Sequence, residues 1–374
     1  MATRALLLTR ADSASGYEHL QRTLTLAGHL AGQRGFGVKT VLMGDEKSLQ
    51  HCRELGLSVV FFPAWELKLA VRRHLLAQLL RGLYLLAAPH LLVFDGYDFS
   101  DTYWGRSFFA DLFPNSVFFG LDIYRHRDGA ERPEREPYQP VNLQWIVNSL
   151  HAPFGRQESR EGNARVFFGT DYLILPPTIA RAPRWRPTDD APVAVYLHGR
   201  AARATHRLLS VLAEAAFSEH RFHIFTDHSE LFSHYISPRI AISEPVPQER
   251  FLAAFTGSLF GITSAGFSLC ELAHLGVPLI IVPVSLAEYG SAEKFIEQGF
   301  GELVTAGSLG FKSRLRAALT RMSDEALRKR YSECGRKLID DRGLSRVGDL
   351  MAQAAAQATV VEPENLAESA GHTS

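Results

Sequence analysis

The stretch ITSAGFSLCELAHLGVPLIIVP, residues 262–283, decides how the second half of this chain is expected to fold. It predicts a short apolar strand, a turn of small residues, a helix, and a second buried strand that ends at proline. The turn at Ser264, Ala265 and Gly266 lies where the helix begins. Because a helix N-terminus presents unpaired backbone N–H groups and a partial positive charge, we expect a phosphate group to bind at this turn.

The helix after the turn carries further groups for the same ligand. Glu271 lies about one turn into the helix, within reach of a sugar hydroxyl next to the phosphate. We count Phe267 and Ser268, in the first helical turn, among the nucleotide-binding residues. The arrangement suits a nucleotide diphosphate.

Composition limits the classes of function. The chain has 374 residues, enough for two domains, and 46% hydrophobic and 21% charged residues are typical of a soluble globular protein. A formal net charge of zero argues against broad binding to nucleic acid or acidic membranes. Cys52, Cys270 and Cys334 lie far apart, with neither a disulfide framework nor metal-type spacing, so we expect a cytoplasmic protein.

No uncharged apolar run is long enough to span a membrane, so we expect no stable membrane insertion. The segment at residues 65–88 is apolar and has two interpretations. We favour a crossover helix of an α/β domain over a basic amphipathic helix that rests on a membrane surface. The charged and histidine residues that interrupt this segment are Glu66, Lys68, Arg72, Arg73, His74 and Arg81.

Strand and helix patterns alternate along both halves, which predicts an α/β protein with two Rossmann-like, doubly wound parallel-sheet domains. The expected strands are residues 5–9, 38–43, 58–62, 91–95, 117–121, 145–147, 165–168, 172–175, 193–197, 222–226, 240–242, 259–263, 279–282 and 302–304. The expected helices are residues 18–33, 67–86, 203–216, 248–255, 268–275, 292–298, 309–322, 324–339 and 344–355.

A proline-rich and charged break separates the two patterns and cannot support a regular element. The expected domains are an N-terminal Rossmann-like domain at 1–175, a linker at 176–191 and a C-terminal Rossmann-like domain at 192–342, followed by a helix at 343–357 and a disordered tail at 358–374. Two such domains would face each other across a cleft, and ligands of open parallel sheets bind beyond the carboxyl ends of the strands.

His19 is expected in the first turn of a helix that follows the first strand. There the helix dipole favours a neutral imidazole, which can act as a general base. The alternative is a partly buried histidine that caps a surface turn. Arg22, one turn on, would orient an anion or would simply be solvated.

Asp95 and Tyr97 follow another strand of the same half. A tyrosine hydroxyl binds phosphate or sugar oxygens, whereas an aspartate at a strand end often only caps the next helix. The histidines between His198 and His234 do not match a metal-ligand pattern, so we expect neither a metal nor a cofactor.

Four segments together resemble the UDP-sugar hydrolases of the pseudaminic acid pathway, which cleave UDP from a diacetamido-trideoxy-altrose. That family is similar to the glycosyltransferase that makes lipid II and shares its GT-B fold. The segments are GYEHLQR (16–22) with LTLA (24–27), LLVFDGY (91–97), FGTDYLIL (168–175), and residues 262–283 continued to AEYGSAEKF (287–295).

The resemblance implies that His19 activates water for attack at the anomeric carbon of the sugar, at a site shared with Tyr97, Arg22 and Asp95. It implies that Ser264, Ala265, Gly266 and Glu271 hold UDP, with the glutamate on the ribose, and that a loop contacts phosphate or sugar. It places the reaction in nonulosonic acid and surface polysaccharide biosynthesis, including flagellin glycosylation. The loop residues are Ser15, Gly16, Tyr17 and Glu18.

Three positions depart from the family's pattern. Glu18 replaces a glycine before the histidine, and it would repel a diphosphate or polarise His19. The loop with Gly199 and Arg200 replaces a Gly-Gly-Ser/Thr-Asp loop, and Arg200 would supply phosphate charge instead. The pair Glu288-Tyr289 replaces Asn-Gln in the nucleotide-binding set.

Three functions are consistent with these residues. The leading hypothesis is a UDP-sugar hydrolase, a monomer or weak oligomer whose partner is its UDP-sugar substrate and not a nucleic acid. The alternative is a UDP-sugar-dependent glycosyltransferase, which needs an acceptor. The third is a nucleotide-sugar binding protein with impaired catalysis, because of the three departures.

Overall fold

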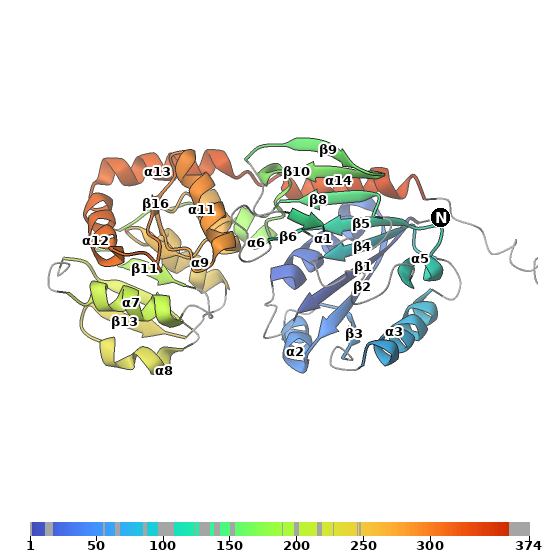
Figure 1. The fold of residues 1–374 in the computed structure, drawn as a ribbon, viewed down its shortest axis with the longest axis horizontal. Coiled ribbons are helices and arrows are strands. Elements are labelled where there is room, and N and C mark those ends of the chain that lie inside the picture. The colour runs from blue at the N-terminus through green and yellow to red at the C-terminus, as the bar shows by residue number, and fades with distance from the viewer. Residues whose placement is uncertain are drawn as a thin grey trace, which may run out of the picture. The chain divides into compact units, whose positions relative to one another are not determined.

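The structure, a computed structural model, describes residues 2–11, 18–54, 57–63, 68–84, 88–95, 108–122, 124–126, 135–137, 143–149, 154–188, 190–197, 202–214, 219–226, 228–244, 246 and 248–358. The chain divides into two compact units (Figure 1). Unit 1 comprises Met1–Leu150, Arg156–Pro176 and Arg342–Ser374, and unit 2 comprises His151–Gly155 and Pro177–Asp341.

The main sheet of unit 1 has the strand order β3-β2-β1-β4-β5-β8-β10-β9 in the described part of the chain, and its strands are parallel except for the edge strand β9. Its strands are β1 (Arg4–Ala11), β2 (Gly37–Gly44), β3 (Val60–Phe62), β4 (Leu91–Asp95), β5 (Val117–Leu121), β8 (Trp145–Asn148), β9 (Gln157–Glu161) and β10 (Ala164–Phe168), and β6 (Tyr124–His126) pairs with β7 (Arg135–Pro137) outside this sheet. The helical elements are α1 (Glu18–Arg34), α2 (Glu46–Glu54), α3 (Leu69–Leu83), α5 (Phe108–Leu112), η3 (Thr170–Tyr172) and α14 (Gly343–Ala355).

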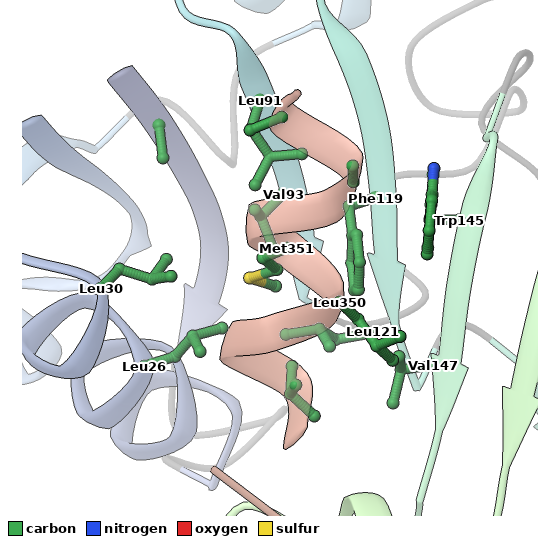
Figure 2. Packing of buried hydrophobic residues seen from close by; sticks show 14 of the residues in the cluster. Leu26, Leu30, Leu91, Val93, Phe119, Leu121, Trp145, Val147, Leu350 and Met351 are labelled. Carbon is green, nitrogen blue, oxygen red and sulfur yellow. The ribbon is translucent and has the colours of Figure 1, made fainter. Parts of the chain in front are cut away.

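Side chains of the central strands point alternately to the two faces of this sheet, and both faces are buried. In β4, Leu92 and Phe94 join the core that α3 and α5 cover, whereas Leu91 and Val93 join the core under α1 and α14. Figure 2 shows Leu91 and Val93 beside α14, and Leu26 and Leu30 of α1 belong to the same cluster. A run of consecutive apolar residues is what a parallel strand covered on both faces requires.

The final helix, α14, packs on unit 1 although it follows unit 2 in the sequence. Leu350 and Met351 belong to the core shown in Figure 2. The indole N–H of Trp145 in β8 donates to Oε1 of Gln357, which follows the helix, over 3.2 Å. The chain therefore passes from one unit to the other three times within its described residues, at 155–156, 176–177 and 341–342.

The described strands of unit 2 form a parallel sheet in the order β13-β12-β11-β14-β15-β16, which is the doubly wound order. The strands are β11 (Val193–Tyr196), β12 (Phe222–Phe225), β13 (Ile240–Ser243), β14 (Gly261–Thr263), β15 (Leu279–Ile281) and β16 (Glu302–Leu303). The helical elements are α6 (Pro177–Ala180), α7 (Ala202–Leu212), α8 (Ser229–Phe232), η5 (Ser233–Tyr235), α9 (Gln248–Thr256), α10 (Phe267–Leu275), α11 (Leu286–Glu297), α12 (Phe311–Met322) and α13 (Glu325–Leu338).

Three local expectations need correction. The strand expected at residues 172–175 is absent, because the chain there forms η3 and then leaves the sheet. The polar strand β9 was not expected, since its mostly exposed residues carry no apolar signal. The segment 176–191 does contain a regular element, α6, and its Trp185 is 9% exposed, with the indole N–H donating to the carbonyl of Ser258. Residues 177–188 of this segment therefore belong to unit 2 and do not form a separate linker.

Two further expectations concern the surface and the tail. The segment at 65–88 is a crossover helix in its described part, because Leu76 and Leu80 of α3 are fully buried under the sheet. Within the described ranges, no helix has both the length and the apolar character needed to cross a membrane. Of the tail expected to be disordered, residues 359–374 lie outside the described residues.

Candidate functional site

In each unit, described site residues lie where the strand order reverses: His19, Arg22 and Asp95 in unit 1, and Ser264, Ala265 and Gly266 in unit 2. In unit 1, the order turns at β1, which pairs with β2 on one side and with β4 on the other. In unit 2, β11 pairs in the same way with β12 and β14. Such switch points open a crevice at the carboxyl ends of parallel strands, and this is the usual ligand site of doubly wound sheets.

In unit 1, His19 and Asp95 form a direct pair at this point. His19 lies in the first turn of α1, and Asp95 is the last residue of β4. Nδ1 of His19 lies 2.8 Å from Oδ1 of Asp95, and the His19 side chain is 18% exposed whereas that of Asp95 is fully buried. The pair has the arrangement of a general base whose second nitrogen is held by a carboxylate.

Two further side chains of α1 hold the Asp95 carboxylate. Arg22 donates to both of its oxygens, with an Nε to Oδ2 distance of 3.1 Å. The Thr23 hydroxyl donates to Oδ2 over 2.7 Å. Arg22 is only 3% exposed, so the interpretation of a solvated Arg22 is wrong.

One tautomer of His19 suits both the contact with Asp95 and the role of a base. Nδ1 is within 2.8 Å of a carboxylate oxygen and 2.9 Å of Nη2 of Arg22. Arg22 already donates through Nη2 to Oδ1 of Asp95. In the tautomer that carries its proton on Nδ1, this nitrogen donates to the ionised carboxylate, which can only accept, and Nε2 keeps the lone pair that a base needs.

Asp95 is ionised in this setting. Burial alone would raise the pKa of Asp95, but the Arg22 charge and the hydrogen bonds from His19 and Arg22 outweigh burial and lower the pKa to about 2. The carboxylate can therefore orient His19 and stabilise the imidazolium that forms when the base takes up a proton.

Sequence reasoning missed the second carboxylate of this cluster, Asp122, and its partner Ser149. Arg22 donates through Nη1 to Oδ2 of Asp122. Asp122 directly follows β5 and accepts from the backbone N–H of Ser149 over 2.6 Å and from its hydroxyl over 3.1 Å. It has a φ of +43°, in the left-handed region that few residues other than glycine adopt. Asp95 was selected because it lies at the end of a buried strand. Asp122 directly follows the buried strand β5, so the same criterion applied to the sequence would have selected it as well.

In unit 2, the turn before α10 is largely buried. Ser264 is 1% exposed, and its hydroxyl oxygen has no hydrogen-bond partner within the described part of the chain. Gly266 is the N-cap of α10, and a Cβ placed on it would meet no described atom within 4 Å. An unsatisfied hydroxyl beside open space at a helix N-terminus fits a phosphate ligand.

Glu288 already binds to this turn. Its Oε2 accepts from the backbone N–H of Val284 over 2.9 Å and from that of Ala265 over 3.3 Å. Its own N–H donates to the hydroxyl of Ser285, the N-cap of α11. Glu288 is 7% exposed, so one buried side chain joins the turns after β14 and β15.

The structure describes four other nucleotide-site residues. Glu271 is 7% exposed and Phe267 is 9% exposed, both on α10. The Ser268 hydroxyl lies 3.4 Å from that of Thr263. Tyr289 is half-buried, in the first turn of α11. Their contacts with a nucleotide stay predictions.

Several expected site residues lie outside the described residues: Ser15, Gly16, Tyr17, Tyr97, Gly199 and Arg200. Glu18 begins α1, but its side chain lies outside the description as well. Among the residues that the structure describes, no group of three His, Cys, Asp or Glu side chains could hold a metal ion.

Sequence comparison finds a relative of this chain among known proteins. No model of a known protein family matches the chain. The chain is similar to the spore coat polysaccharide biosynthesis protein SpsG of Bacillus subtilis, with 27% identity over 225 residues, 54% of this chain and 62% of the relative. The chain thus spans less than two thirds of that relative's length.

Two solved structures cover nearly the whole chain. MurG of Acinetobacter baumannii matches with a TM-score of 0.64 and 13% identity over 94% of this chain and 99% of its own. UDP-GlcNAc 2-epimerase of Neisseria meningitidis, bound to UDP-GlcNAc, matches with a TM-score of 0.61 and 9% identity over 94% of this chain and 100% of its own. The chain has the GT-B fold, with two Rossmann-like α/β domains, as the sequence predicted.

Proposed function

We propose that the protein acts on a nucleotide-linked sugar in polysaccharide biosynthesis and hydrolyses it, releasing UDP from a UDP-linked acetamido deoxy sugar. The observation that carries this proposal is the His19–Asp95 pair at the switch point of unit 1. The likeness to SpsG and to enzymes of the GT-B fold supports the wider class of function. The resemblance to the pseudaminic acid pathway hydrolases supports the specific reaction.

In the proposed reaction, Nε2 of His19 removes a proton from water, and the water oxygen forms a bond to the anomeric carbon of the sugar. The bond from that carbon to the diphosphate oxygen breaks, and the electron pair leaves with UDP. Asp95 holds the imidazole and stabilises its protonated form. In unit 2, the N-terminus of α10 offers the backbone N–H groups and partial positive charge that suit a diphosphate.

The His19→Ala variant tests this proposal. It should release UDP from the accepted UDP-sugar at least about a hundredfold more slowly than wild type, because general-base catalysis contributes about that factor. The matched control is His90→Ala. His90 lies at the amino end of β4, whereas Asp95 lies at its carboxyl end, and His90 accepts a hydrogen bond from the backbone N–H of Arg4. Equal rates for His19→Ala and wild type would rule out His19 as the base.

A glycosyltransferase is the second candidate, and the exposed face of α3 favours it. Val71 and Leu75 are 47% and 38% exposed there, in a segment that also carries Arg72 and Arg73. An apolar face with basic neighbours suits a glycan or lipid acceptor. Release of UDP only when an acceptor is added would select this candidate over the hydrolase. Tight UDP binding without turnover on any sugar would select a binding protein.

A further inference from the structure

Glu288 places a carboxylate at the turn where the nucleotide phosphates are expected. Its Oε2 lies 3.3 Å from the backbone nitrogen of Ala265, one residue before the N-cap of α10. The same oxygen accepts from Val284 N–H, so the side chain is fixed between two turns. With 7% exposure, its charge is poorly screened by water.

The space next to this carboxylate is suited to a ligand. Gly266 has no described atom near the position of a Cβ, and the Ser264 hydroxyl is buried and unsatisfied by any described residue. A phosphate that enters here uses N–H groups beyond the one that Glu288 holds. It also comes close to a negative charge that belongs to the protein.

We propose that Glu288 determines the specificity of this site for phosphate charge, favouring a nucleotide diphosphate that is esterified to a sugar over the free diphosphate. This inference rests on the proposed function of the protein. In the sugar ester each phosphate carries one negative charge, whereas free UDP gains a further charge above its last phosphate pKa of about 6. The carboxylate repels that additional charge, so the product binds less tightly than the substrate and leaves more readily.

The Glu288→Gln variant separates charge from geometry. The glutamine carbonyl oxygen can still accept from both backbone N–H groups, while the negative charge is removed. The variant should bind UDP about tenfold more tightly than wild type at low salt, UMP by a smaller factor, and uridine unchanged. Because salt screens the repulsion, the gain for UDP should shrink at high salt.

Titration calorimetry with uridine, UMP and UDP at pH 7.5 measures these affinities. The matched control is Glu297→Gln, which removes an exposed carboxylate in the last turn of the same helix and should leave all three affinities unchanged. A Glu288→Gln effect that is absent, or equal for uridine and UDP, would overturn the role of Glu288 and leave the proposed function intact. Absence of UDP binding to wild type and variant alike would overturn the proposed function, and this inference with it.

Discussion

At the scale of single residues, a buried ion cluster organises unit 1. Asp95 accepts hydrogen bonds from His19, Arg22 and Thr23, and Arg22 also pairs with Asp122. Buried charges persist only when they are paired and hydrogen-bonded, so the cluster holds His19 in one orientation at a cost in desolvation. Such an arrangement is typical of a site in which orientation matters more than stability.

The Asp95→Asn variant should be less stable than wild type by about 2–4 kcal/mol at pH 7, because it leaves the Arg22 charge less well paired. The pKa of Asp95 is lowered to about 2 from 3.8, so its contribution is complete above about pH 4 and is lost as the pH falls toward 2. The difference between variant and wild type should therefore shrink over that range.

Urea unfolding between pH 7 and pH 2.5 measures this difference. Asp111→Asn is the matched control, since Asp111 is exposed on α5 and its replacement should change the free energy of unfolding by less than about 0.5 kcal/mol. A difference for Asp95→Asn that does not depend on pH would contradict an ionised Asp95.

The sequence predicted part of this cluster. His19 and Asp95 could be found because each lies next to the carboxyl end of an apolar strand. Their direct contact could not, because it depends on β1 and β4 being neighbours in register, with Thr9 opposite Asp95. Thr23 carries no signal of its own, since a threonine in a helix is ordinary.

At the scale of elements, two glycines of the β14–α10–β15 segment have different functions. Gly276 ends α10 with a φ of +76°, and a Cβ there would lie 2.8 Å from Oγ of Ser332 in α13. Gly266 has a negative φ and open space at its Cβ position. The first glycine is required by the fold, whereas the second is required only by the expected ligand.

The Gly276→Ala variant should lower the free energy of unfolding by about 2–3 kcal/mol, because the left-handed conformation and the contact with α13 both oppose a methyl group. Chemical denaturation followed by circular dichroism measures the loss. An unchanged midpoint would show that α10 and α13 pack differently from the structure.

The Gly266→Ala variant should keep the stability of wild type within about 0.5 kcal/mol. It should bind UDP at least about tenfold more weakly, because the methyl group occupies the space through which a phosphate approaches. Calorimetry gives the affinity, and unaltered UDP binding would place the phosphates elsewhere.

The sequence predicted most elements of unit 2, since strand and helix alternate there with clear boundaries. It predicted α11 only in part, at residues 292–298 instead of Leu286–Glu297. Pro283 and Ser285 precede the helix, and serine is a preferred N-cap residue, so these two residues predict a helix start near residue 286. In unit 1, β9 was missed because an exposed edge strand does not need apolar residues.

At the scale of the whole molecule, the chain returns to its first unit. Residues 342–358 follow all of unit 2, yet α14 fills a face of the unit 1 sheet beside α1 (Figure 2). A pattern in the sequence gives the apolar face of this helix but not the sheet that it covers. The helix at 343–357 was expected to be separate from both domains, and in the structure it belongs to unit 1.

The Met351→Ala variant should lower the free energy of unfolding by about 2–4 kcal/mol, because Met351 is fully buried in that core. Gln353→Ala, on the exposed side of the same helix, should have little effect. Equal stability of the two variants in urea would contradict the packing of α14 on unit 1.

The central claim is that the protein releases UDP from a nucleotide sugar by attack of water at the anomeric carbon. Incubating the protein with a panel of UDP-sugars in ¹⁸O-water, without an acceptor, tests this claim most directly by mass spectrometry of both products. The account predicts that one UDP-sugar yields free UDP without label and a free sugar that carries ¹⁸O. Label in UDP, or no UDP release from any UDP-sugar without an acceptor, would contradict it.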